Sequence, residues 1–377
     1  MYCPLSIPGR RDASRPLAQR VSRRGSTFGL VWLAGTTLLL GGITRPARAQ
    51  QRPDQIIPLR GALVAGTISS TSQTEIIVRA RGADQKFSVL DVRRVTFGDE
   101  PRELSSSRDA IHNGQWELAR DQLRRIDTAA IARDLVRQDV DFYLALVLGK
   151  LAMTGGGDKD AAAQAMMAFA RSAPKSFHFV EAAEMLGTLA VSREKFDEAA
   201  KYYGFLTKTA QEAGWTEFEL RVGVLEGRSL EAQGKFAEAA ARYDAVIASS
   251  IDSADAAQQK NMARVGKAVT LAETGKVDEG IQMLEEIIRQ NDIQAEELFG
   301  RTYNALGRCY LKQNKPKEAL LAFLHTDTLF PQQPEVHAEA LYHLSKLWTT
   351  ANKSDRAVAA RSLLTERYAG SSWAKRQ

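Results

Sequence analysis

The stretch Leu306–Phe323, LGRCYLKQNKPKEALLAF, contains the pattern that decides the fold. Its apolar residues follow the helical period on both sides of Asn314. Because Asn enters the left-handed conformation that ends helices at little cost, the stretch predicts two helices joined by a tight turn. Variants of it recur about every 40 residues from Ser106 to Leu364. Such recurrence predicts an α-solenoid, in which each helical hairpin buries its apolar face against its neighbours.

Three columns of residues define the register of the repeat. A small residue that opens each second helix, which we call the anchor, recurs at spacings of 42, 38, 40, 41, 39 and 38 residues. Twelve positions before it lies another small residue, and four positions after it a mostly large one. We therefore expect the two helices of a hairpin to approach closely at the small residues, while the large residue fills space against the next repeat. The anchors are Ala119, Ala161, Ala199, Ala239, Gly280, Ala319 and Ala357. The expected turn residues, five positions before the anchors, are Gly114, Gly156, Glu194, Gly234, Gly275, Asn314 and Asn352.

This pattern resembles the tetratricopeptide repeat (TPR). Leu306-Gly307, Tyr310, the turn at Asn314, Ala319, Phe323 and Pro331 match its signature, and residues 235–240 and 195–200 match its turn-to-second-helix segment. The resemblance covers residues 104–370 and implies a mainly α fold, a TPR-like α-solenoid of about seven helical hairpins. The period near 40, where the family has 34, implies longer helices or loops. The outer units depart from the pattern, since Ala161 has no large residue four positions later and Arg361 occupies that position in the last unit.

The N-terminal 49 residues predict an export signal. An Arg-rich segment to Arg24 is followed by an apolar run over 28–43, and Ala47-Arg48-Ala49 gives a small-x-small cleavage site. The uncharged window over 25–44 is long enough for the alternative of an uncleaved membrane anchor. The Sec and Tat routes both stay open, and the mature protein is expected in the periplasm or secreted. The end of the last unit, residues 367–374, looks like unit endings in exported bacterial cell-envelope repeat proteins, with a C-terminal tail expected over 371–377.

The charge distribution argues against a nucleic-acid-binding protein. The formal net charge is +6, but residues 1–49 contain eight Arg and one acidic residue. The rest of the chain has 43 basic and 44 acidic residues, so the basic character belongs to the leader.

A short β segment precedes the repeats. We expect a linker over 50–58 and a small SH3-like or Sm-like β module over 59–100. Its strands are expected at Leu63–Ile68, Glu75–Ala80, Lys86–Leu90 and Val92–Phe97. So small a unit is marginal alone, which predicts that it docks on the solenoid.

The sequence shows no catalytic constellation. Cys309 is predicted to be a buried core residue, and His337 and His343 lack the helical spacing of a metal pair. Gly155–Lys159 lacks the spacing of a phosphate-binding loop and is expected to be a long turn. We therefore expect no enzyme, no cofactor, no metal and no small-molecule substrate.

The surface of the first helices is the remaining candidate site. In TPR arrays the first helix of each unit lines a concave groove, and positions 18, 15, 11 and 8 before the anchor point into it. Here this face is expected to be basic from unit 4 onward, with an apolar floor at unit 5. Such a groove suits an acidic extended peptide or a carboxylate terminus. The candidate residues are Lys150, Arg221, Arg228, Met262, Val265, Arg301, Asn304, Arg308, Tyr342 and Lys346, accompanied by Glu181, Glu184 and Val269.

Three alternatives remain open at this point. The groove charges could be ordinary solvated side chains, or the protein could be a self-assembling component of the cell envelope. A glycan or nucleic-acid binder acting through the β module is the third. The favoured reading is an exported scaffold that binds a protein or peptide partner without catalysis, with possible association to the envelope.

Overall fold

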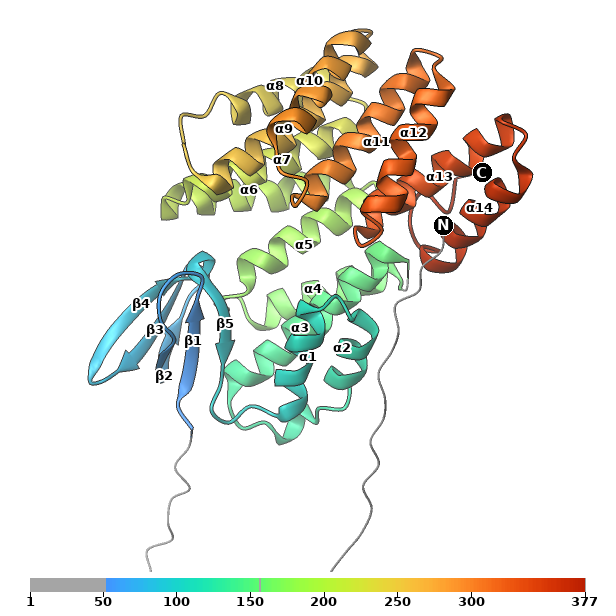
Figure 1. The fold of residues 1–377 in the computed structure, drawn as a ribbon. Coiled ribbons are helices and arrows are strands. Elements are labelled where there is room, and N and C mark those ends of the chain that lie inside the picture. Colours follow the sequence, from blue (N-terminus) through green and yellow to red (C-terminus); the bar gives the residue numbers. More distant parts are fainter. Residues whose placement is uncertain (1–51, 156, 377) are drawn as a thin grey trace, which may run out of the picture. The chain divides into compact units, whose positions relative to one another are not determined.

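The computed structural model describes residues 52–155 and 157–376. The expected leader and the alternative membrane anchor lie outside these residues. In the part that is described, an N-terminal sheet precedes fourteen α-helices that follow one another as antiparallel pairs (Figure 1). The predicted mainly α array of seven hairpins is therefore confirmed.

The β module is a five-stranded antiparallel sheet with the order β4-β3-β2-β1-β5. Successive side chains of a strand point to opposite faces of the sheet. In residues 75–80 this places Ile76, Val78 and Ala80 on the buried face, and the residues between them are more exposed. A short 3-10 turn at Val89–Asp91 links the last two strands, where the sequence predicted a continuing strand. The strands are β1 (Asp54–Pro58), β2 (Val64–Thr71), β3 (Glu75–Ala80), β4 (Ala83–Ser88) and β5 (Val92–Thr96).

The expected linker over 50–58 is wrong for its second half. Asp54–Pro58 is strand β1, and it pairs with both β2 and β5. The flanking prolines and the polar start of the segment concealed the strand. Asp54 is buried because its carboxylate is satisfied by partners from elsewhere in the chain, namely Arg133 and two backbone N–H groups.

The helices of the array are of ordinary to long length for globular proteins. Their bounds are α1 (Arg102–His112), α2 (Trp116–Leu123), α3 (Asp134–Thr154), α4 (Lys159–Ser172), α5 (Phe179–Ser192), α6 (Phe196–Ala213), α7 (Thr216–Ala232), α8 (Phe236–Ile247), α9 (Ala254–Glu273), α10 (Val277–Gln290), α11 (Glu296–Lys312), α12 (Pro316–Leu329), α13 (Pro334–Thr350) and α14 (Ser354–Arg367).

The turn column behaves as expected from residue type. Gly234 has φ +73° and Asn314 has φ +57°, the left-handed region that ends a helix. Glu194, the one residue of unfavourable type in the column, adopts the same conformation at φ +58°. In unit 2 the expected turn residue, Gly156, lies outside the described residues, and its neighbour Gly155 is left-handed.

The small-residue column makes room for aromatic rings. A Cβ atom on Gly227 would lie 2.4 Å from the Tyr243 ring, and one on Gly307 would lie 2.6 Å from the Phe323 ring. Tyr243 also lies against Gly266 of the next hairpin, where a Cβ would approach to 2.2 Å. The large residue therefore fills space against the next repeat, as predicted, and also covers the small residue of its own hairpin.

The expected anchor of unit 2 is wrong by one residue. Ala161 is exposed, whereas Ala162 and Met166 are buried and occupy the small and large positions. The shift arises because α4 begins late, after Asp158 caps it by accepting hydrogen bonds from the N–H groups of Asp160 and Ala161. In unit 7 the position four residues after the anchor is the half-buried Arg361, and Leu364 is buried one turn later.

The C-terminal residues are part of the last unit and do not form a separate tail over 371–376. Ser371 is buried, and Trp373 packs against the cluster formed by α12, α13 and α14. Its ring centroid lies 5.4 Å from that of Tyr342.

The β module docks on the array, as its small size predicted. Ile56, Val95 and Phe97 share one apolar cluster with Leu104 of α1 and Val136 of α3. Contact also joins distant units of the array, because α13 lies against α3. A Cβ on Gly370 would lie 2.7 Å from the Cα of Gly155, so the turn after α14 touches the turn after α3.

Candidate functional site

The first helices of the units surround two cavities. The first cavity, about 710 Å³, is lined by side chains of α3, α5, α7 and α11 together with the turn before α13. The second cavity, about 540 Å³, lies among α7, α9, α11 and α13. Arg301 of α11 lines both. These volumes are in the range of pockets that hold small ligands or a few residues of a peptide.

Seven of the ten predicted groove residues line these cavities. Lys150, Arg221 and Arg301 line the first cavity. Arg228, Met262, Val265, Arg301 and Arg308 line the second cavity. The family register therefore placed most of the inward side chains correctly, whereas no binding role follows from position alone.

Three predicted groove residues lie elsewhere. Asn304 is only 2% exposed and donates hydrogen bonds to Val336 O at 2.7 Å and to Glu339 Oε2 at 3.1 Å, so it joins α11 to α13. Tyr342 packs beside Trp373, with the Lys346 ammonium 5.3 Å from its ring centre. Lys346 lines a separate pocket between α13 and α14.

The first cavity, which includes residues of units 1 to 3, is not basic, and the basic face was expected only from unit 4 onward. Its lining includes four basic and five acidic side chains, and the nearest opposite charges are paired. Arg221 lies 2.6 Å from Glu184, and Arg301 lies 2.9 Å from Glu297. The basic residues are Lys150, Arg221, Arg301 and Arg367, and the acidic ones are Glu117, Glu181, Glu184, Glu297 and Glu335.

The second cavity has one more positive than negative charge, with four Arg and three Glu in its lining. Arg308 is near all three carboxylates, at 3.5 Å from Glu231, 3.6 Å from Glu273 and 3.9 Å from Glu339. Burial opposes the charge of Arg308, but these carboxylates outweigh it and raise its pKa. Burial also raises the pKa of Glu231 despite the attraction of Arg308.

Among the four arginines that line the second cavity, Arg228 and Arg376 have no carboxylate oxygen of the described residues within 4.0 Å, and Arg376 lies over the Trp373 ring instead, 4.0 Å from its centroid. Nη2 of Arg228 lies 3.6 Å from the sulfur of Met262. Burial, and next the charge of Arg301, lower the pKa of Arg228. The side chain is therefore held in the cavity wall as a charge that its own chain does not neutralise.

The lone cysteine of the array is a core residue, as predicted. Cys309 is 1% exposed, and burial raises the pKa of its thiol to about 11. Over residues 52–155 and 157–376, no group of three His, Cys, Asp or Glu side chains is arranged to hold a metal ion. No helix in the same residues is long and apolar enough to cross a bilayer.

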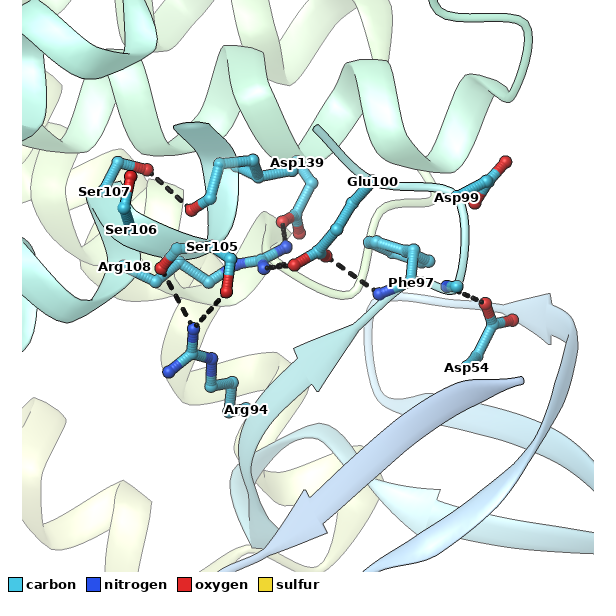
Figure 2. Close-up of polar contacts among 12 residues, drawn as sticks. Asp54, Arg94, Phe97, Asp99, Glu100, Ser105, Ser106, Ser107, Arg108 and Asp139 are labelled. Atoms are coloured by element: carbon cyan, nitrogen blue, oxygen red, sulfur yellow. Dashed lines mark hydrogen bonds and ion pairs between the residues drawn. The ribbon is translucent and has the colours of Figure 1, made fainter. Parts of the chain in front are cut away.

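A buried charge cluster beside the β module was not predicted from the sequence. Figure 2 shows Arg108 between Glu100 and Asp139. Its Nη1 donates to both oxygens of Glu100 at 2.8 Å, and its Nη2 donates to Asp139. Asp139 is also 2.7 Å from Nε2 of His178, and we call these four residues the junction cluster. The available signal was Asp139 itself, an acid within the otherwise apolar face of a long helix.

Comparison with known proteins agrees with this architecture. Residues 224–296 and 265–334 each match the family model of the tetratricopeptide repeat. No curated protein matches the sequence significantly. The crystal structure of NprR in complex with its cognate peptide NprX is similar with a TM-score of 0.54 at 10% identity, over 70% of this chain and 76% of that chain. A tetratricopeptide repeat protein from Parabacteroides merdae has a TM-score of 0.48 at 14% identity, over 70% of this chain and 91% of that chain. With its seven hairpins and its turn and anchor columns, the chain has a TPR-like α-solenoid fold, and residues 224–334 within it match the tetratricopeptide repeat family.

Proposed function

We propose that this protein is an exported, non-catalytic scaffold that binds a protein or peptide partner on the inward face of its repeats. The observation that carries the proposal is the pair of cavities joined at Arg301. Together they expose charged side chains next to the apolar side chains of Met262 and Val265. A peptide offers the same mixture of backbone, charged and apolar groups.

Two further observations support the proposal. NprR, whose repeats have a similar fold, was crystallised with a peptide. The leader of this chain contains the features of an export signal, which would bring the array to partners in the periplasm or at the cell envelope. The partner is proposed to be a peptide or a protein segment, and its acidity is taken up in the next subsection.

A cavity-blocking variant tests the proposal. Lys150 is an exposed residue of the first cavity, so Lys150→Trp fills space there without removing a core contact. Lys201→Trp, at an exposed position on the second helix of unit 3, is the matched control. Proteins captured from the envelope fraction by the wild type and by Lys201→Trp should be lost with Lys150→Trp. Equal capture by all three would overturn binding at the first cavity and with it a site that spans the two cavities.

A further inference from the structure

An arginine lies eleven residues before the anchor in units 1, 4 and 6, and one of these three arginines, Arg228, has no counter-ion among the described residues. Arg228 and Arg308 both lie eleven residues before the anchors of their units and line the second cavity. Arg308 has three carboxylates within 4.0 Å, whereas Arg228 has none among the described residues. A guanidinium has five N–H donors, and the only acceptor recorded for Arg228 is the thioether of Met262, which is weak. An uncompensated charge in such a place is costly, which suggests that a ligand completes the arrangement.

The surroundings of Arg228 define what such a ligand offers. Met262, Val265 and Val269 of α9, which we call the apolar floor, line the same cavity. Two further atoms in the lining residues, Nε2 of His343 and Oε1 of Glu339, are buried without a hydrogen-bond partner, and Oε1 lies 3.9 Å from Nη1 of Arg308. Burial lowers the pKa of His343 to about 4, so its ring is neutral near pH 7. The cavity thus lacks an anion beside Arg228 and has two polar atoms without hydrogen bonds, in the same lining as the apolar floor.

The charges around the second cavity favour a carboxylate over a phosphate. Arg301 is already paired with Glu297 and Glu335, and Glu273 is paired with Lys312 as well as with Arg308. Arg228 is the one arginine of the first helices in this lining that has no carboxylate of the described residues within 4.0 Å, and a single carboxylate would pair with it. A phosphate group with nearly two negative charges would face Glu231, Glu273 and Glu339 and would be repelled. An Arg fork also binds a carboxylate through two parallel hydrogen bonds.

We infer that the second cavity binds a peptide segment in which one carboxylate pairs with Arg228 and a neighbouring aliphatic side chain rests on the apolar floor. This inference rests on the proposed function and specifies its ligand. The backbone N–H groups of the segment supply donors for Glu339. Arg228 is then the anchor of the carboxylate, and the paired Arg301 and Arg308 are part of the wall.

Three short probes test the inference. The first is acetyl-Ala-Leu-Ala-Leu with a free C-terminal carboxylate, and the second is the same peptide with a C-terminal amide. The third, acetyl-Ala-Asp-Ala-Leu-amide, has its carboxylate on a side chain only. Binding to the wild-type protein is measured by ligand-observed NMR. At least one carboxylate probe should bind tenfold or more tightly than the uncharged amide, and the two carboxylate probes distinguish a chain terminus from an acidic side chain.

The variants decide whether Arg228 is responsible. Arg228→Gln should remove the preference for carboxylate, while Arg289→Gln, a change of the same kind at an exposed position of α10, should keep it. Thermal unfolding of Arg228→Gln confirms that it is folded. A preference that survives Arg228→Gln, or equal binding of all three probes, would overturn the inference. So would equally effective competition by inorganic phosphate.

The outcome is separable from that of the proposed function. If Arg228→Gln captures the same envelope proteins as the wild type while Lys150→Trp does not, the inward face binds a partner but Arg228 does not hold a carboxylate. If Lys150→Trp captures everything, a binding site that spans both cavities is excluded, whatever the probes show at Arg228.

Discussion

Arg108 and Arg228 occupy the same position of the repeat, eleven residues before the anchors Ala119 and Ala239, yet they lie in opposite environments. Arg108 is 3% exposed in its side chain and lies between two buried carboxylates. Arg228 lies in a cavity wall with a thioether as its nearest acceptor. The β module supplies one half of the difference, because Glu100 lies between β5 and α1, and α3 supplies the other half through Asp139. The repeat register therefore sets the direction of a side chain, and the elements packed above it set whether its charge is compensated.

Replacing Arg108, the arginine whose charge is compensated, should lower the free energy of unfolding more than any other change proposed below. Arg108→Met leaves Glu100 and Asp139 buried without their common partner, and we expect a loss of about 3–5 kcal/mol in the free energy of unfolding. Chemical denaturation measures it. Arg79→Met, which removes an exposed pair with Asp84, should cost less than about 1 kcal/mol. Equal losses of unfolding free energy in the two variants would show that the junction cluster stabilises the fold no more than an exposed ion pair does.

A third buried carboxylate of the same region, Asp54, should make the protein sensitive to acid. Burial would raise the pKa of Asp54, but hydrogen bonds from Arg133, Ile68 N–H and Gly98 N–H outweigh it, so the pKa is lowered from 3.8. A depressed pKa stabilises the fold above the ordinary value and loses that contribution as pH falls through the folded value. Asp54→Asn should therefore cost about 2 kcal/mol at pH 7.

The difference between wild type and Asp54→Asn should shrink as the pH falls from about 4 to 2, because the wild-type carboxyl becomes protonated. Urea unfolding at several pH values measures this. A difference that stays constant over the interval would show that Asp54 is not an ionised partner of Arg133.

Arg308 is an intermediate case and should give an intermediate effect. Arg308→Met leaves Glu231, Glu273 and Glu339 together, but these side chains are 16–23% exposed to the cavity, so we expect a loss of about 1–2 kcal/mol. Because the pKa of Glu231 is already raised, its ionisation opposes folding as pH rises above the ordinary 4.5. The loss should therefore be larger at pH 7 than at pH 5, and Arg308→Met combined with Glu231→Gln should recover part of it. A loss without pH dependence would assign it to packing.

The smallest effect, of opposite sign, is expected at Arg228. Arg228→Met removes a partly buried charge with no counter-ion, so the free energy of unfolding should stay unchanged or rise by up to about 1 kcal/mol. Arg289→Met, at an exposed position, should stay within about 0.5 kcal/mol of wild type. A loss above 1 kcal/mol at Arg228 would reveal a partner in the folded chain and would remove the contrast with Arg108.

The features that depend on local residue type, such as helix ends and close helix contacts, could be predicted from the sequence. Asn314 and Gly234 end helices by residue type, and Gly227 is small because Tyr243 lies over it, so both columns were visible as periodicities. The β1 strand was missed because Asp54 is tolerated in the interior only through Arg133, far away in the chain. Most inward side chains followed from the register, but their charge balance did not.

The counter-ions explain why the face from unit 4 onward is less basic than the sequence predicted. Arg308 meets Glu231 from two units earlier, and Arg301 meets Glu335 from the next unit. Such ion pairs depend on how the units are arranged in space. An analysis that takes one repeat position at a time holds no information on that arrangement. Asn304 shows the same limit, since its amide is taken up by the backbone of Val336.

The contact between Gly155 and Gly370 changes how this array should unfold. In an open solenoid each unit touches only its sequence neighbours, so the last hairpin can fray with little effect on the rest. Here the end of unit 7 also touches unit 2 through these two glycine backbones, and α13 lies against α3. Unfolding of the last hairpin therefore breaks its contacts with unit 6 and also its contacts with unit 2. The terminal unit is consequently tied to the cooperative unfolding of the array, and a bound segment would be released by a collective opening more readily than by local fraying.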